Sequence, residues 1–304
     1  WGEGHTLRLT INRADYWDHR GGITFGPEAT YANLRRWLEA GDEASLRRVF
    51  EGRAEEEPGR PRRPTRLPMG RVDLALPPAL TLERATLHLG EGVAECALAG
   101  PGPATVRAVV PRGRPVLALR IDGLGAHAVQ PASRPPDAAE VLAHWRDHGI
   151  ADPAVEDGAE RGGWFQALPA DPGLYVAWER VPAEGQAVEV YVAAAYGKDL
   201  QAARAAAEEE ISRAAEAGYV ALEEAEALWW RRYWGRTAAL VVPDATLQEA
   251  YDLGMYKLAG IASPGAPPAT LQGPWVEEHR MPPWSADYHF NINVQECYWP
   301  AYAG

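Results

Sequence analysis

The stretch that decides the fold runs from Arg71 to Ile121, RVDLALPPALTLERATLHLGEGVAECALAGPGPATVRAVVPRGRPVLALRI. Successive side chains of a strand point to opposite faces, so alternation of apolar and polar residues predicts strands. Glycine and proline separate the alternating segments, and short strands joined by tight turns are typical of an antiparallel sandwich. Five strands are predicted in this stretch, at 71–76, 85–89, 93–98, 105–110 and 116–121.

Strand patterns continue on both sides of this stretch. Residues 5–11 alternate before a polar, aromatic loop that ends at Gly21-Gly22. Three more strands are predicted after it, at 164–168, 173–180 and 186–195, and two short helices precede it, between Tyr31 and Glu51 and broken near Gly41. A helix is expected over 137–148, with Asp137 as its N-cap and Gly149 at its end. We therefore expect an N-terminal antiparallel β-sandwich domain over residues 1–197.

The periodicity changes to that of a helix at Asp199, a residue type that commonly caps helices. Helices are predicted over 199–217, 221–235 and 246–261, the first ended by Gly218. Strands followed by helices, without interleaving, indicate two segregated units in place of one mixed α/β sheet.

The composition excludes some partners. The net charge of −12 argues against nucleic acid or an anionic membrane surface as a partner. We expect no membrane span, because no apolar run is long enough to cross a bilayer. The chain begins at Trp1 without an initiator Met, so the expectation is that any targeting signal was removed or lies outside this sequence. The compartment stays open, with secretion or the periplasm compatible with the sequence.

The candidate metal and cofactor motifs each lack a residue, a helix or a spacing that the motif requires. His144 and His148 have the spacing of a zinc pair on a helix, but Trp145 stands where a metalloprotease needs Glu. Gly123-Leu-Gly125 follows a strand without opening a helix, so it does not make a dinucleotide loop. Cys96 and Cys297 lie too far apart to form a CxxC motif. We expect no metal and no cofactor.

The segment from Trp284 to Pro300, WSADYHFNINVQECYWP, has a different character. His289, Asn291 and Asn293 are spaced i, i+2, i+4, so they would project from one side of an extended backbone. Amide side chains both donate and accept hydrogen bonds, which suits a ligand covered in hydroxyls. Four aromatic residues nearby offer flat apolar faces for a sugar ring: Trp275, Trp284, Tyr288 and Trp299. The alternative is that these residues only anchor loops.

LQGPW at 271–275 and MPPWSADYHFNINVQECYWPA at 281–301 resemble the signature of glycoside hydrolase family 95, the inverting α-L-fucosidases and α-L-galactosidases. The resemblance implies a β-sandwich, then a helical linker over 198–242 and the first part of an (α/α) barrel over 243–304. It also implies that Asn291 activates the attacking water with Asn293 as its partner, and that His289 binds a sugar hydroxyl. We expect Trp275, Trp284 and Asp287 to contribute to the same glycan-binding surface.

Inverting cleavage also needs a general acid on the opposite side of the sugar. The family's acid and its assisting carboxylate lie downstream of the YWP motif, so the resemblance places both beyond Gly304. We therefore expect this chain to be a fragment without hydrolase activity of its own. Glu296-Cys297 departs from the family's Met-containing pair, which leaves the sugar open. The alternatives are a non-catalytic carbohydrate-binding module and, ranked last, a related helical-barrel phosphorylase, because the amide-rich set offers no basic phosphate ligand.

Overall fold

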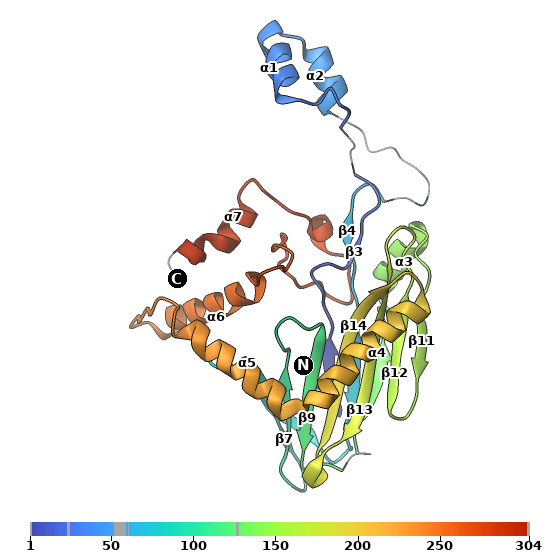
Figure 1. Cartoon of the computed structure of the whole chain (residues 1–304), viewed down its shortest axis with the longest axis vertical. Helices are drawn as coiled ribbons and strands as arrows, with labels where there is room; N and C mark the ends of the chain where they lie inside the picture. Colours follow the sequence, from blue (N-terminus) through green and yellow to red (C-terminus); the bar gives the residue numbers. More distant parts are fainter. Residues whose placement is uncertain (1, 23–24, 52–58, 60, 126–127, 303–304) are drawn as a thin grey trace.

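The computed structural model describes residues 2–22, 25–51, 59, 61–125 and 128–302. Antiparallel sheets occupy the first two thirds of the chain, and helices follow them (Figure 1). The larger sheet has eight strands in the order β11-β12-β13-β14-β9-β8-β7-β6. Every neighbouring pair in it is antiparallel, which confirms the antiparallel strands predicted from the alternation. Its strands are β6 (Thr81–His88), β7 (Val93–Ala99), β8 (Ala104–Val109), β9 (Val116–Asp122), β11 (Ala154–Asp157), β12 (Arg161–Gln166), β13 (Gly173–Pro182) and β14 (Val188–Gly197).

A smaller sheet packs on one face of the larger one. It has the order β1-β2-β5-β10 and is formed by Gly2–Glu3, Thr6–Thr10, Arg71–Ala75 and Gln130–Arg134. Leu74 of β5 and Ile121 of β9 lie in the same buried core, together with Trp178 of β13. The predicted strand at 71–76 therefore belongs to a different sheet from the other four, which local alternation cannot distinguish.

Helix α3 (Ala139–Asp147) closes one end of this core with Val141 and Trp145, both buried. The predicted N-cap is wrong by one position: Ala138 is the cap residue, and no side chain bonds to the first turn. Asp137 lies outside the helix because the helical backbone begins only at Ala139. The predicted stop near Gly149 agrees with a C-cap at His148.

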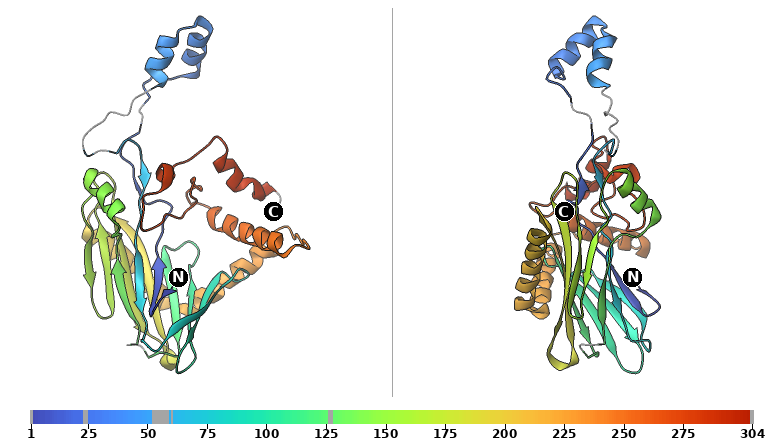
Figure 2. Two further views of the ribbon diagram at one scale, coloured as in Figure 1. Left: turned by 180° about the vertical axis from the view of Figure 1, so that it is seen from behind. Right: turned by 90° about the vertical axis from the view of Figure 1, so that its right-hand side faces the viewer.

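Helix α4 (Leu200–Ala217) covers the other face of the larger sheet (Figure 2). Its small residues Ala203 and Ala207 are fully buried and let the helix lie close to the strands. Gly197 is required at the approach, because a Cβ there would lie 2.1 Å from the backbone nitrogen of Ala203. Asp199 caps the helix by accepting a hydrogen bond of 2.8 Å from the Ala202 amide, as predicted.

Further helices follow α4 in the chain, and the first of them still packs against the larger sheet. They are α5 (Tyr219–Trp234), α6 (Ala245–Ile261) and α7 (Asn293–Tyr298), with short 3-10 turns η2 (Pro283–Ala286) and η3 (Trp299–Tyr302). No helix among the described residues is long and apolar enough to cross a membrane. Two helices after residue 243 do not define a ring, so the start of an (α/α) barrel stays a prediction.

A helical hairpin is inserted between two short strands, β3 (Trp17–Asp18) and β4 (Thr65–Arg66). Helices α1 (Tyr31–Ala40) and α2 (Glu43–Phe50) are broken at Gly41, as predicted, where φ is +66°. Figure 1 shows the hairpin beyond the end of the sheets, on the side of β3 and β4. The strands at its base contact the candidate site.

Candidate functional site

Arg66 of β4 attaches the LQGPW segment to the β-rich part of the chain. Its side chain is buried, and Nη1 donates to the Gly273 carbonyl at 2.7 Å. Nη2 donates to the carbonyls of Pro274 and Arg13, each at 2.7 Å. Burial lowers the pKa of the guanidinium to about 10, so the group is still charged at neutral pH. One cation therefore ties together backbone groups that lie more than 200 residues apart.

Trp275 is held in position by its neighbours, with its ring half exposed. Gly273 has φ +65°, and a Cβ there would lie 3.0 Å from two atoms of the Trp275 ring. Only glycine provides both this backbone conformation and this close approach. On the other side, the amide of Val276 donates to Asn12 Oδ1 at 2.8 Å. The ring therefore has a defined orientation before any ligand arrives.

The turn that precedes His289 is unusual. Trp284, Ser285 and Ala286 all have left-handed backbones, with φ of 49°, 61° and 49°. Each such residue costs about 1–2 kcal/mol relative to a right-handed one, and such conformations cluster at functional sites. The turn is closed by the Leu271 amide, which donates to the Asp287 carbonyl at 3.0 Å.

The turn brings three predicted site residues together. The Trp284 ring stacks on the His289 imidazole, with centroids 5.4 Å apart and an interplanar angle of 18°. His289 Nε2 lies 2.6 Å from Asp287 Oδ1, and both side chains are partly buried. The Asp287 carboxylate thus lies beside Nε2 at ion-pair distance, and Nδ1 is the other ring nitrogen through which His289 can bind a ligand.

Asn291 and Asn293 do not follow the predicted one-sided arrangement. The chain turns after Phe290, and α7 begins at Asn293, because the amide of Val294 donates to the His289 carbonyl at 3.1 Å. Asn291 is exposed and Asn293 partly buried. Over the described part of the chain, neither side-chain amide makes a hydrogen bond, so both are available to a ligand.

Trp17 contacts the site through Tyr288. The sequence did not predict this role, nor the roles of Arg66 and Asn12. The buried Trp17 ring stacks on Tyr288, with centroids 6.0 Å apart and an interplanar angle of 15°. Its indole nitrogen donates to the Ala14 carbonyl at 3.0 Å. The dense aromatic composition of residues 12–22 was the available signal, but it does not say which ring Trp17 meets.

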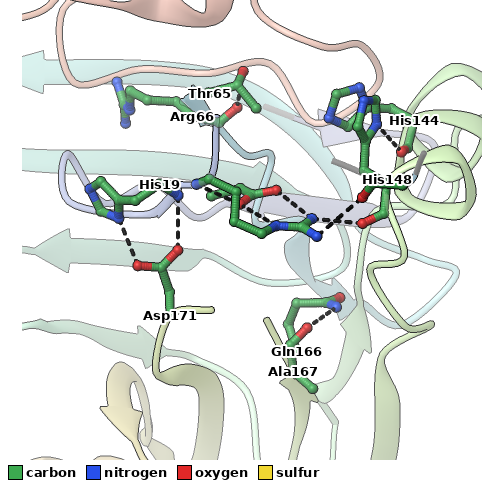
Figure 3. A network of polar contacts seen from close by, with 11 residues as sticks. His19, Thr65, Arg66, His144, His148, Gln166, Ala167 and Asp171 are labelled. Carbon is green, nitrogen blue, oxygen red and sulfur yellow. Dashed lines mark hydrogen bonds and ion pairs between the residues drawn. The ribbon is translucent and has the colours of Figure 1, made fainter. Parts of the chain in front are cut away.

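A polar network holds the loop after Trp17 (Figure 3). His19 is bound twice by Asp171: the carboxylate accepts from the His19 amide at 2.9 Å and lies 2.8 Å from Nδ1. The fully buried Asp18 accepts two hydrogen bonds from the Arg20 guanidinium, at 2.9 and 2.8 Å, and one from the Arg20 amide at 3.1 Å. Arg20 also donates to the His148 carbonyl at 2.6 Å. These contacts hold in place the loop that follows Trp17, the residue whose ring stacks on Tyr288.

His144 lies beside this network and carries a pH prediction. Burial, together with the nearby His148, lowers the pKa of His144 to about 4. Between pH 6.5 and 4 the unfolded chain binds more protons than the folded one, so stability falls as the pH falls through this window. Allowing for the partial exposure of the ring, we expect a loss of about 1–2 kcal/mol from this residue. Urea unfolding at pH 7 and pH 4.5 should show a smaller pH effect in His144→Gln, and an equal effect would contradict the assignment.

The comparisons with known proteins bear on this same segment. Residues 231–304 match the sequence model of the glycosyl hydrolase family 95 catalytic domain. This part of the chain is similar to the family 95 catalytic domain. The match confirms the resemblance predicted from LQGPW and the Trp284–Pro300 segment, and it identifies glycosyl hydrolase sequence.

A short stretch of the chain is also similar in sequence to a named fucosidase. The probable alpha-fucosidase A of Aspergillus niger (strain ATCC MYA-4892 / CBS 513.88 / FGSC A1513) is 45% identical over 49 residues. The alignment covers 16% of this chain and 6% of that protein, so the chain spans a small part of its relative's length. A solved structure described as a putative kojibiose phosphorylase from human microbiome has a TM-score of 0.43 at 10% identity, over 63% of this chain and 30% of that one.

Proposed function

We propose that this chain provides the sugar-binding and water-positioning part of a glycoside hydrolase that removes a terminal α-linked L-fucose or L-galactose-type sugar with inversion. The observation that carries the proposal is the arrangement at the turn. Trp284 stacks on His289, His289 lies at ion-pair distance from Asp287, and two side-chain amides without hydrogen bonds follow in the chain. This arrangement lies within the stretch that matches family 95. The proposal includes the division into a β-sandwich at 1–197, a helical linker at 198–242 and the first part of an (α/α) barrel at 243–304.

Each group has a defined role in the proposed reaction. Trp284 presents an apolar face to the sugar ring, while the remaining imidazole nitrogen of His289 bonds a hydroxyl. Asn291 and Asn293 hold the attacking water. An amide is too weak a base to act alone, so the water also needs a carboxylate and the leaving oxygen needs a general acid. Asp287 is already paired with His289, and the acid is assigned to no residue of this chain.

Binding of a monosaccharide tests the proposal without requiring turnover. We expect saturation-transfer NMR to detect methyl α-L-fucopyranoside on the chain, and His289→Ala to weaken binding about tenfold, because one hydrogen bond is worth about 1 kcal/mol and an orphaned Asp287 adds to the loss. Asn291→Ala with Asn293→Ala should weaken it less, since these amides act mainly on the water.

The matched control is Gln201→Ala, which removes an exposed amide on α4, far along the chain from the site. Unchanged affinity in His289→Ala, with the variant folded, would refute the assigned site. Inversion is checked separately in any preparation that turns over an α-L-fucoside, where NMR of the first product must show the opposite anomer.

A further inference from the structure

Helix α1 of the inserted hairpin carries an exposed apolar stripe. Tyr31 and Leu38 are 78% and 61% exposed, and Leu34 between them is partly buried. Spaced i, i+3, i+7, these three side chains lie on one face of the helix, the spacing of a coiled-coil seam. We infer that this stripe is a dimer contact, in which α1 packs antiparallel on α1 of a second copy of the chain. The contact is independent of the proposed function.

A different face of α1 packs on α2. Trp37 is 8% exposed and meets the Phe50 ring edge-on, with ring centroids 6.3 Å apart. Consecutive side chains of a helix diverge by about 100° around its axis. Leu38 therefore points away from α2 when Trp37 points toward it, and the hairpin leaves Leu38 and Tyr31 exposed while it buries Trp37 and Val49.

The position of the hairpin lets a second copy reach the stripe. Figures 1 and 2 show α1 and α2 projecting beyond the end of the sheets. Their lengths, 10 and 8 residues, are below the length of about 12–15 residues at which isolated helices become stable in water. A partner surface on α1 adds apolar burial that so short a pair of helices lacks.

The charges of the hairpin favour a second copy over a charged partner. Residues 25–51 contain four arginines and five carboxylates, whereas the whole chain has a net charge of −12. Two copies of so acidic a chain repel each other least where the charge is nearly balanced. The ion pairs of the hairpin, at 2.6–3.0 Å, join Arg35 to Glu39, Arg47 to Glu43 and Glu51, and Arg48 to Glu28. An anionic partner would therefore meet arginines that already have carboxylate partners.

A two-fold axis through the middle of the stripe makes it complementary to itself. In the antiparallel arrangement Tyr31 of each copy meets Leu38 of the other, and Leu34 lies beside the axis. Such a contact uses the same patch on both copies, so it closes at two. One ten-residue helix from each copy buries less than the standard interface of about 1,600 Å², so we expect a reversible dimer with a Kd on the order of 10–100 μM.

Sedimentation equilibrium of the chain, at concentrations on both sides of this Kd, measures the association. Leu38→Glu should weaken it by more than about tenfold, because the seam would bury an unpaired carboxylate from each copy. Leu247→Glu is the matched control: it places the same charge at a leucine of α6 that is 62% exposed, and it should leave the association unchanged. Thermal unfolding shows that each variant is folded.

Cysteine cross-linking tests the antiparallel arrangement. Leu34→Cys, beside the two-fold axis, should form an intermolecular disulfide on mild oxidation. Ala40→Cys, exposed on a side of α1 that faces away from the stripe, should not, and the unmodified chain with Cys96 and Cys297 sets the background. A chain that stays monomeric at all concentrations, or a dimer that Leu38→Glu leaves intact, would overturn the contact. Equal cross-linking of the two cysteine variants would overturn it as well.

Discussion

Replacing Arg66 with alanine is expected to lower the free energy of unfolding by about 3–4 kcal/mol. Each hydrogen bond from a charged group contributes about 1.5–3 kcal/mol, and the contributions of bonds made by one side chain do not add in full. Three backbone carbonyls, those of Arg13, Gly273 and Pro274, lose their donor at once. The LQGPW segment loses its attachment, so we also expect sugar binding to weaken more than tenfold. Urea unfolding and saturation-transfer NMR measure the two effects.

Two further variants separate this attachment from a general loss of charge. Arg66→Lys keeps the cation but not the planar fork, so it should restore only part of the stability. Arg213→Ala removes a surface arginine paired with the exposed Glu209 and with Glu210, the latter at 3.3 Å, and should change stability by less than about 1 kcal/mol. An Arg66→Ala protein as stable as the unmodified chain would show that the three contacts do not hold the segment.

Replacing Trp178 with alanine is expected to lower the free energy of unfolding by about 4 kcal/mol, within the range for large-to-small changes at buried tryptophans. Trp178 is 1% exposed at the centre of β13. Its indole nitrogen donates to Ser133 Oγ and Asp157 Oδ1, both at 3.1 Å, which connects three strands. Unlike Arg66→Ala, this variant should leave sugar affinity per folded molecule unchanged, because Trp178 does not touch the site.

Trp178→Phe is the control for the ring itself. It keeps most of the apolar volume and loses the donor, so we expect a smaller loss of about 1–2 kcal/mol. If urea unfolding showed Trp178→Ala to be destabilised by no more than Trp178→Phe, the packing of the core against this ring would be wrongly described.

Local patterns were enough to predict much of the fold. The strands between Arg71 and Ile121 follow from alternation, and α4 follows from Asp199 and Gly218, whose effects reach only a few residues along the chain. The cap at Asp137 was wrong for the same reason, since a shift of one residue is invisible to a local rule. Sheet membership also escaped prediction, because β5 alternates in the same way as β9.

The candidate site divides in the same way. Its residue types could be found in the sequence, because His289, Asn291, Asn293, Trp284 and Asp287 lie within ten positions of one another. Their arrangement could not, since the left-handed turn at Trp284–Ala286 and the helix from Asn293 replace the extended backbone that the spacing suggested.

By itself, then, the sequence determined the antiparallel strands, the order of strands before helices, and the resemblance of residues 231–304 to the family 95 catalytic domain. Only the tertiary structure decided that Trp17 of β3 and its cross-strand partner Arg66 of β4 bind that segment. Contacts between residues 200 or more positions apart depend on how the sheets pack and where the strands end. No periodicity or spacing along the chain encodes that, whereas a buried cation in reach of three carbonyls shows it directly.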